Sequence, residues 1–298
     1  MNAIRSIPLW LIFIVAGVHQ VIMGGTFPFA RYVLQLMDPF AVAFIRYVLS
    51  SVVLVAIAWR MGKKQDSPSI TGRDKKIIAI LGLTIVVLNQ TLYLYGQKFT
   101  TAAHGGLLFA ATPVFVYLLA MKHLGEKWSI RKGIGILMAV AGTVIIFFEQ
   151  GLKFNYDILL GDIIILLAVI AWAYYTVYGK PLVMKYGALR VTAWSLGFGT
   201  LVYFPFGLYR LIIADLSRMD SYGWLAILYI ALITSVIGYS LWYWLIKQME
   251  ASRVAVLTNI QPLVAGFLGY YLLGEAITWP FVVAGLIILT GVVITQRA

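Results

Sequence analysis

The sequence predicts an all-α polytopic membrane protein, with ten transmembrane helices arranged as two inverted five-helix repeats. Composition is the first reason, because 62% of the 298 residues are hydrophobic and 11% are charged. Soluble domains contain about 45–50% apolar and about 25% charged residues. The second reason is a series of ten apolar stretches, each close to the roughly 20 residues with which a helix crosses a bilayer. The third is a sequence register that recurs 149 positions along the chain.

The ten stretches occupy nearly the whole chain and leave no room for a soluble domain. The first begins within MNAIRSIPLW, in which Arg5 is the one basic residue; no small-residue cleavage site stands out, so we expect a retained span. The longest polar connection runs from Gly62 to Lys76. The expected spans are residues 8–29, 39–60, 75–95, 101–122, 130–148, 159–179, 190–213, 222–246, 253–273 and 277–295.

The recurring register is clearest in two copies of Leu-Gly-Glu, within HLGEKWSIR (His123 to Arg131) and LLGEAITWP (Leu272 to Pro280). The same offset pairs Glu126 with Glu275, Pro113 with Pro262, Gly125 with Gly274, Gly142 with Gly291 and Ser129 with Thr278. Because five spans is an odd number, the second copy must enter the membrane upside down. We therefore predict a first repeat at residues 1–149 and an inverted second repeat at 150–298.

Charge sets the expected orientation. The formal net charge is +12, and ten spans place most Lys and Arg residues on the face that carries both termini. The positive-inside rule then makes both termini cytoplasmic and predicts a multi-pass protein of the cytoplasmic (inner) membrane. We expect the basic face to contact membrane lipids, with no nucleic-acid partner.

Reactive side chains are sparse. Cysteine is absent, and His19, His104 and His123 are scattered without a carboxylate cluster. A membrane enzyme needs a convergent nucleophile, base or metal set. We therefore expect no enzymatic activity, catalytic residue, metal site or cofactor.

The paired glutamates have two interpretations. Gly125 and Gly274 suit the left-handed residue that ends a helix, and Ser129 and Thr278 suit the N-cap of the next. A glutamate at such a junction is favoured near a helix N-terminus and then has a local structural role. The alternative is that Glu126 or Glu275 takes part in gating.

Several motifs together resemble the drug/metabolite transporter (DMT) superfamily, specifically its ten-helix EamA-type members. They are a mid-span proline in ATPVF (Ala111 to Phe115) and IQPLV (Ile260 to Val264), the following Leu-Gly-Glu, MGGTF (Met23 to Phe27) and DPFAVAFIRY (Asp38 to Tyr47). The resemblance implies a carrier for small organic solutes, often an exporter. It also implies a mid-membrane cavity lined by spans one, three, four, six, eight and nine.

Mid-span polar and aromatic residues of these spans are the candidate substrate contacts, because polar groups at this depth are costly unless they face a cavity or a partner. They are His19, Gln20, Asn89, Gln90, Tyr93, Trp172, Tyr175, Tyr239, Trp242, Tyr243, Asn259 and Gln261. The amides equally suit interhelical hydrogen bonding, and His19 equally suits a satisfied core histidine. The aromatic residues also suit plain helix packing, although Tyr239, Trp242 and Tyr243 share one helical face.

Prolines and one arginine complete the candidate set. Pro113 and Pro262 interrupt their helices, which gives either a hinge or a fixed kink. Arg46 lies inside span two, where an unpaired guanidinium is costly. We expect a structural role for Arg46, since the resemblance places a similar arginine in members with unlike substrates; contact with substrate is the alternative.

These expectations converge on a secondary transporter that moves small amphipathic metabolites, such as amino acids, by alternating access. The many π faces and neutral amides suit a zwitterion, whereas quaternary amines are the rival substrates because aromatic faces also attract cations. A scaffold would not need inverted duplication. We expect a small-molecule substrate and either a monomer or a homodimer.

Overall fold

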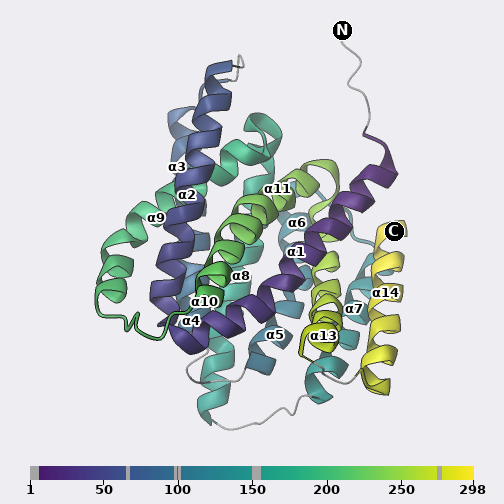
Figure 1. Ribbon diagram of the computed structural model, residues 1–298. Coiled ribbons are helices and arrows are strands. Elements are labelled where there is room, and N and C mark those ends of the chain that lie inside the picture. Colours follow the sequence, from purple (N-terminus) through teal and green to yellow (C-terminus); the bar gives the residue numbers. More distant parts are fainter. Residues whose placement is uncertain (1–6, 65–67, 97–98, 100–101, 150–155, 274–276) are drawn as a thin grey trace.

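The computed structural model describes residues 7–64, 68–96, 99, 102–149, 156–273 and 277–298. Within these ranges the chain forms ten helical spans long and apolar enough to cross a membrane (Figure 1), which confirms the predicted fold class. The first two spans are α1 (Leu9–Leu36) and α2 (Pro39–Lys64). The third span consists of α3 (Gly72–Gly82), η1 (Leu83–Asn89) and α4 (Gln90–Gly96), and the fourth consists of α5 (Ala102–Ala110) and α6 (Thr112–Leu124). The fifth span is α7 (Ile130–Glu149).

The second five spans repeat this order. The sixth and seventh spans are α8 (Tyr156–Tyr186) and α9 (Ala188–Ile212). The eighth span consists of α10 (Ser221–Leu228), η2 (Tyr229–Gly238) and α11 (Tyr239–Gln248), and the ninth consists of α12 (Ala251–Val256), η3 (Leu257–Ile260) and α13 (Gln261–Leu273). The tenth span is α14 (Trp279–Arg297). Spans one, six and eight run longer than their apolar cores suggest. Helix α1, for example, continues until just before Asp38, whose carboxylate accepts the backbone N–H groups of Phe40 and Ala41 and so caps α2.

The second and seventh spans show that the repeats are inverted. Ser51 of α2 and Thr200 of α9 lie 149 positions apart in the sequence, and their hydroxyl oxygens are 2.8 Å apart. On one side of this contact Gly207 lies against Phe44, and on the other Gly197 lies against Val55. Residue numbers thus rise along one helix as they fall along its partner, so the two matching helices are antiparallel.

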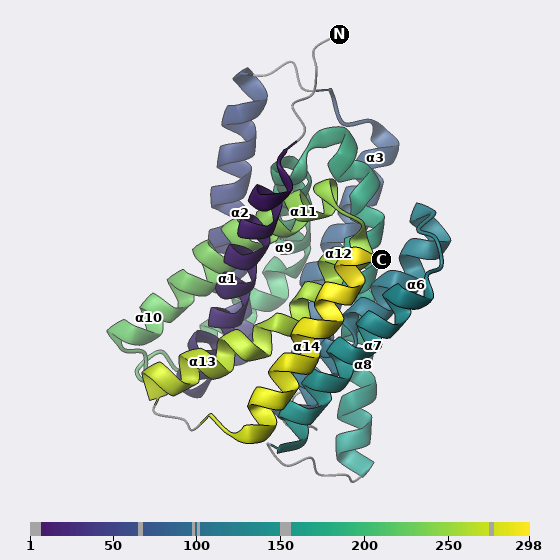
Figure 2. The same cartoon turned by 90° about the vertical axis from the view of Figure 1, so that its right-hand side faces the viewer.

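Helices α7 and α14 repeat this geometry at the opposite edge of the bundle (Figures 1 and 2). Gly135 packs on the backbone of Gly291, and Gly142 packs on the backbone of Ala284. The offset of 149 converts the first contact into the second, as a two-fold relation requires. A Cβ atom at either glycine would meet backbone atoms of the facing helix, which is why the sequence keeps glycine there.

The backbone is irregular at matching depths of both repeats. The third and eighth spans contain the π-helical segments η1 and η2. The fourth span breaks between α5 and α6 at Ala111, and the ninth narrows into the 3₁₀ turn η3. Pro113 and Pro262 lie just after these two breaks, so the prolines interrupt their helices as expected.

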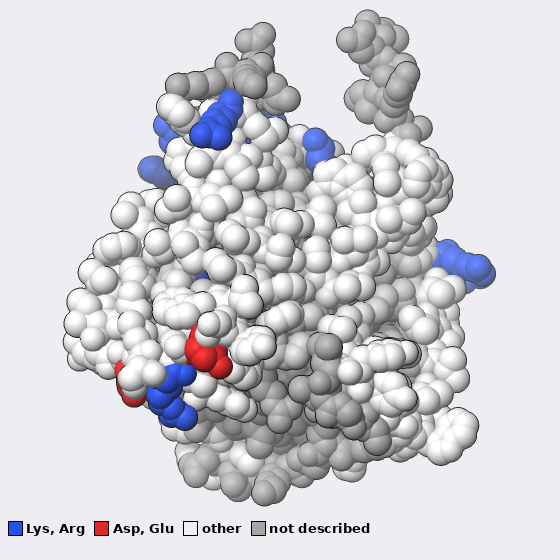
Figure 3. Space-filling view, in the orientation of Figure 1, with Lys and Arg blue, Asp and Glu red and all other residues white. Residues whose placement is uncertain are grey.

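Charged side chains concentrate at the ends of the bundle. We call the side where α1 begins and α14 ends the near face, and the opposite side the far face. Figure 3 shows basic residues gathered at the upper end of the molecule, above a broad uncharged surface that suits the hydrocarbon of a bilayer. Acidic side chains appear in this view at the lower left, beside basic ones, toward the far face.

Candidate functional site

A cavity of about 250 Å³ lies between the two repeats. It is lined by α1, α2, α7 and α8 and by the third, fourth, eighth and ninth spans. Ala30, Pro39, Gly105 and Phe147 belong to the far halves of their spans, so the cavity extends from mid-depth toward the far face. Ligand cavities in proteins enclose roughly 300–1,000 Å³, and this one therefore suits a small solute.

The irregular segments explain why polar groups reach this cavity. Asn89 ends η1, Thr234 lies in η2, Thr258 and Asn259 lie in η3, and Thr112 adjoins the break in the fourth span; all line the cavity. Non-helical backbone at membrane depth is tolerated where protein or a cavity surrounds it. Broken helices also mark the substrate sites of repeat-built carriers. The cavity thus has the setting of a binding site.

An aromatic wall forms one side of the cavity. The ring of Tyr239 lies 5.5 Å from that of Trp172, and Trp172 lies 5.6 Å from Trp242. The imidazole of His19 continues the wall, 5.5 Å from Trp242. Trp242 is held in place by its indole N–H, which donates to Thr176 Oγ1 at 3.2 Å. Such a wall offers π faces to the apolar part of a solute.

A chain of amides fixes the orientation of His19. The amide nitrogen of Gln261 donates to Gln20 Oε1 at 3.0 Å, and Gln20 Nε2 lies 3.0 Å from His19 Nδ1. An amide nitrogen only donates, so Nδ1 accepts and the ring proton is on Nε2. His19 is 1% exposed, and its Nε2 has no hydrogen-bond partner. Asn259, also 1% exposed, accepts from Thr143 through Oδ1 and leaves its Nδ2 without a partner.

Arg46 also lines the cavity. Its Nε donates to Ser235 Oγ at 2.7 Å, and its Nη2 donates to the hydroxyl of Tyr239 at 3.1 Å. The guanidinium carbon lies 5.1 Å from the centre of the Tyr47 ring and 5.6 Å from that of Tyr239. Among the acidic side chains that the structure describes, none forms an ion pair with Arg46.

Most residues selected from the sequence meet at this cavity. Those that line it are His19, Asn89, Gln90, Tyr93, Trp172, Tyr239, Trp242, Asn259 and Gln261. Three others lie behind the lining. Gln20 orients His19, while Tyr175 and Tyr243 stack at 4.8 Å, with the Tyr243 hydroxyl donating to the Tyr175 carbonyl. These three support the wall rather than forming it.

Charged residues of both repeats contact one another at the near face. Glu126 is buried and accepts from the backbone N–H of Ser252 at 3.3 Å and from its hydroxyl, at the start of α12. Lys132 Nζ lies 3.7 Å from Glu126 and 2.9 Å from Glu250, and Arg253 Nε lies 2.8 Å from Glu250. We call Glu126, Lys132, Glu250, Ser252 and Arg253 the near-face cluster. It joins the end of the fourth span to the start of the ninth.

The expected caps are present, but the glutamate has another partner. Gly125 ends α6 with φ of +69°, and Ser129 Oγ accepts the backbone N–H of Lys132. Thr278 likewise caps α14. Glu126, however, sits at the N-terminus of a helix in the other repeat rather than at that of α7. Glu275 and Gly274 lie outside the described residues.

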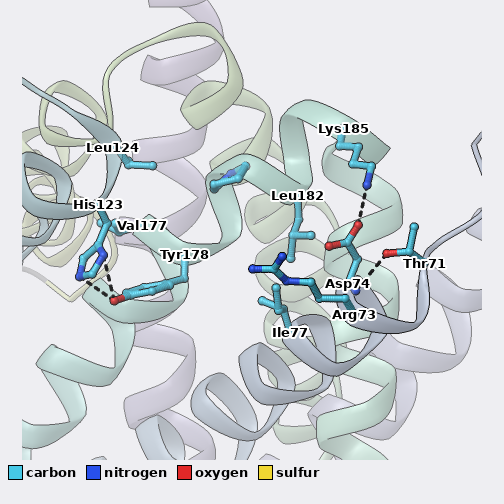
Figure 4. Close-up of a pocket in the computed structure, with 11 residues that line it drawn as sticks. Thr71, Arg73, Asp74, Ile77, His123, Leu124, Val177, Tyr178, Leu182 and Lys185 are labelled. Atoms are coloured by element: carbon cyan, nitrogen blue, oxygen red, sulfur yellow. Dashed lines mark hydrogen bonds and ion pairs between the residues drawn. The ribbon is translucent and has the colours of Figure 1, made fainter.

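A larger cavity of about 430 Å³ lies at the near face, at the ends of α6 and α8 and the start of α3 (Figure 4). Several of its polar groups contact one another. Asp74 accepts from Lys185 Nζ at 2.7 Å and from the Tyr186 hydroxyl at 2.6 Å, and His123 faces the hydroxyl of Tyr178. In this near-face cavity Asp74 and Lys185 are thus already paired with each other.

Fold and cavity together define a membrane carrier built from two repeats. The EamA-like transporter family model matches residues 8–148 and again residues 159–297, so the chain belongs to this family. An uncharacterized transporter of Archaeoglobus fulgidus is 30% identical over 93% of this chain and 94% of its own. A solved crystal structure with 17% identity superposes with a TM-score of 0.79 over 95% of this chain and 96% of its own, which shows a shared fold.

One relative has a more specific name. A probable terminal-alkyne amino-acid exporter of Streptantibioticus cattleyicolor is 24% identical over 92% of this chain and 89% of its own.

Sequence reasoning missed some of the lining. Thr26, Phe109 and Thr234 face the cavity, and they carry no signal that separates them from ordinary membrane-helix residues. Arg46 was a candidate because a charged side chain inside a membrane span is costly. Its place beside Tyr239, however, depends on how the second span packs against the eighth.

Proposed function

We propose that this transporter moves small amphipathic metabolites, such as amino acids, across the cytoplasmic membrane by alternating access, as an exporter or exchanger. The observation that carries the proposal is the central cavity, which combines an aromatic wall with unpaired hydrogen-bond donors at mid-depth. The printed name of the amino-acid exporter relative points in the same direction. In this proposal the cavity binds solute and does no covalent chemistry, so the protein is not an enzyme.

Alternating access requires two conformations. The central cavity extends toward the far face, and charged contacts join the two repeats at the near face; in this proposal, that arrangement is one of the two conformations. We assign residues 1–149 and 150–298 to the two repeats that exchange conformations, with the near-face cluster as the closed gate. The helix breaks before Pro113 and Pro262 are the proposed hinges, because they lie at matching positions of the two repeats. With both termini cytoplasmic, the far face is external.

Flux through purified protein tests this function. Wild-type protein in liposomes is expected to exchange labelled amino acids across the bilayer, without forming a new product. Asn259→Ala is expected to weaken exchange by removing a cavity amide, whereas Arg190→Gln, at a half-buried near-face residue outside the central cavity, leaves it intact. Product formation would indicate an enzyme. Exchange of quaternary amines alone would support the rival substrate class, and the absence of any flux would refute the proposal.

A further inference from the structure

The charge of the cavity lining narrows the substrate class. Arg46 is the one Lys, Arg, Asp or Glu residue among the described residues that line the cavity. A cation inside a membrane span is costly without an acidic partner, and Ser235 and Tyr239 offer Arg46 only neutral oxygens. The site therefore favours a solute that brings one negative charge.

Two unpartnered hydrogen-bond donors in the cavity also favour a solute that brings acceptors. His19 Nε2 and Asn259 Nδ2 are buried, unpartnered donors, and the amide chain through Gln20 and Gln261 fixes the proton of His19 on Nε2. Leaving a buried donor unsatisfied is costly, because the group has lost its hydrogen bonds to water without replacing them. A lining that offers donors suits a solute that brings acceptors.

The aromatic wall connects these groups. It runs from Tyr239, which contacts Arg46, through Trp172 and Trp242 to His19. An apolar body along the wall places one polar end at the guanidinium and the other near the imidazole. The volume of about 250 Å³ and the single cation suit a singly charged carboxylate rather than a phosphate dianion.

We propose that the central cavity selects solutes with one carboxylate, which binds Arg46, and an apolar body, which packs on the Tyr239–Trp172–Trp242 wall. This inference rests on the proposed transport function and adds its specificity. It makes a quaternary amine a poor substrate, because an organic cation would meet the guanidinium without any carboxylate in the described lining to offset it.

Matched probes test the inference in liposomes containing the full-length protein. For the phenylalanine skeleton they are L-phenylalanine, 3-phenylpropanoate, L-phenylalaninamide and 2-phenylethylamine; a leucine series has the same four head groups. Carboxylates are expected to compete for uptake at least about tenfold better than the amide or amine, since a hydrogen bond to a charged group contributes about 1.5–3 kcal/mol. Equal or better competition by the amide or amine would overturn the inference.

Variants locate the effect. Arg46→Gln is expected to raise the half-saturation concentration for carboxylates about tenfold to a hundredfold, with Arg46→Lys between it and wild type. Arg190→Gln removes an arginine outside the cavity and is the matched control. Unchanged carboxylate affinity in folded Arg46→Gln would refute the assignment. Asn259→Asp provides a second test, because an added negative charge is expected to disfavour carboxylates and admit amines; unchanged preference would refute the inference.

The same set of solutes distinguishes failure of the carboxylate site from failure of the proposed transport function. Transport of amines or neutral amides without carboxylates leaves the transporter function standing and overturns the carboxylate site. If wild-type protein moves no member of the panel, the proposed amino-acid transport fails and the carboxylate site fails with it.

Discussion

Lys132 and Arg46 are both cations within the helix bundle, but their surroundings differ. Lys132, whose side chain is 3% exposed, lies within 4 Å of both Glu126 and Glu250 and so joins the two repeats. Arg46 is half-buried beside the central cavity and has neutral partners. A cation paired with acids holds protein segments together, whereas a cation with neutral partners at a cavity still has charge to offer a ligand. In the proposed function, Lys132 therefore belongs to the gate and Arg46 to the binding site.

The largest expected contrast is between the two faces. Lys185→Cys at the near face and Ser221→Cys at the far face introduce single thiols at exposed positions of a chain that has no cysteine. In intact cells an impermeant thiol reagent is expected to label Ser221→Cys and to spare Lys185→Cys, because the positive-inside rule predicts that the basic near face is cytoplasmic. Labelling in permeabilised cells is the control for reactivity. The opposite pattern would reverse the orientation.

Removing one member of the near-face cluster is expected to have the largest effect on stability. Lys132→Ala leaves the buried carboxylate of Glu126 without its cation, and breaking a buried pair costs about 3–5 kcal/mol. Thermal unfolding in detergent measures the loss. Lys132→Met combined with Glu126→Gln is expected to recover part of it, since neither charge then remains unpaired. Equal stability of Lys132→Ala and wild type would contradict the role of the cluster.

A smaller effect is expected at the other cation. Tyr239→Phe removes the hydroxyl that accepts from Arg46 Nη2, and a hydrogen bond to a charged group contributes about 1.5–3 kcal/mol. We expect a moderate loss of stability together with altered carboxylate affinity, because the guanidinium loses one support. Tyr270→Phe, at an exposed ring, is the control. Full retention of both properties would show that Tyr239 does not position Arg46.

The smallest expected effect is a response to pH at the near face. Burial raises the pKa of Glu250, but Lys132 and Arg253 outweigh it and hold the pKa below the usual 4.5. A lowered pKa stabilises the folded state above the usual value, and this contribution is lost as the pH falls through the folded value. Melting temperature is thus expected to hold between neutral pH and about 5 and to decline below about 4.5. Glu250→Gln should remove part of that decline; an identical decline in this variant would exclude Glu250 as its source.

The sequence was sufficient for the architecture because its signals are local. Span length, hydropathy and the offset between Glu126 and Glu275 required no knowledge of packing. In the structure Ser51 and Thr200, which are separated by the same offset, contact each other.

The sequence was less informative about the site because helix packing decides it. Tyr239 and Tyr243 share a helical face, yet Tyr243 turns away to stack on Tyr175 of α8. Similarly, Glu126 meets Ser252 across the repeat boundary. Such contacts depend on which spans are neighbours, and residue spacing within one span does not specify that.

The most direct test of the central claim compares the two cations in one experiment. The ligand is a carboxylate that the protein transports, for example L-phenylalanine. Its binding to folded Arg46→Gln and to folded Lys132→Gln is measured in detergent, and the melting temperature of each variant is measured in the same preparation. The account predicts that Arg46→Gln loses affinity about tenfold or more and that Lys132→Gln loses the greater part of its stability while still binding. Strong binding by Arg46→Gln together with lost binding by Lys132→Gln would contradict it.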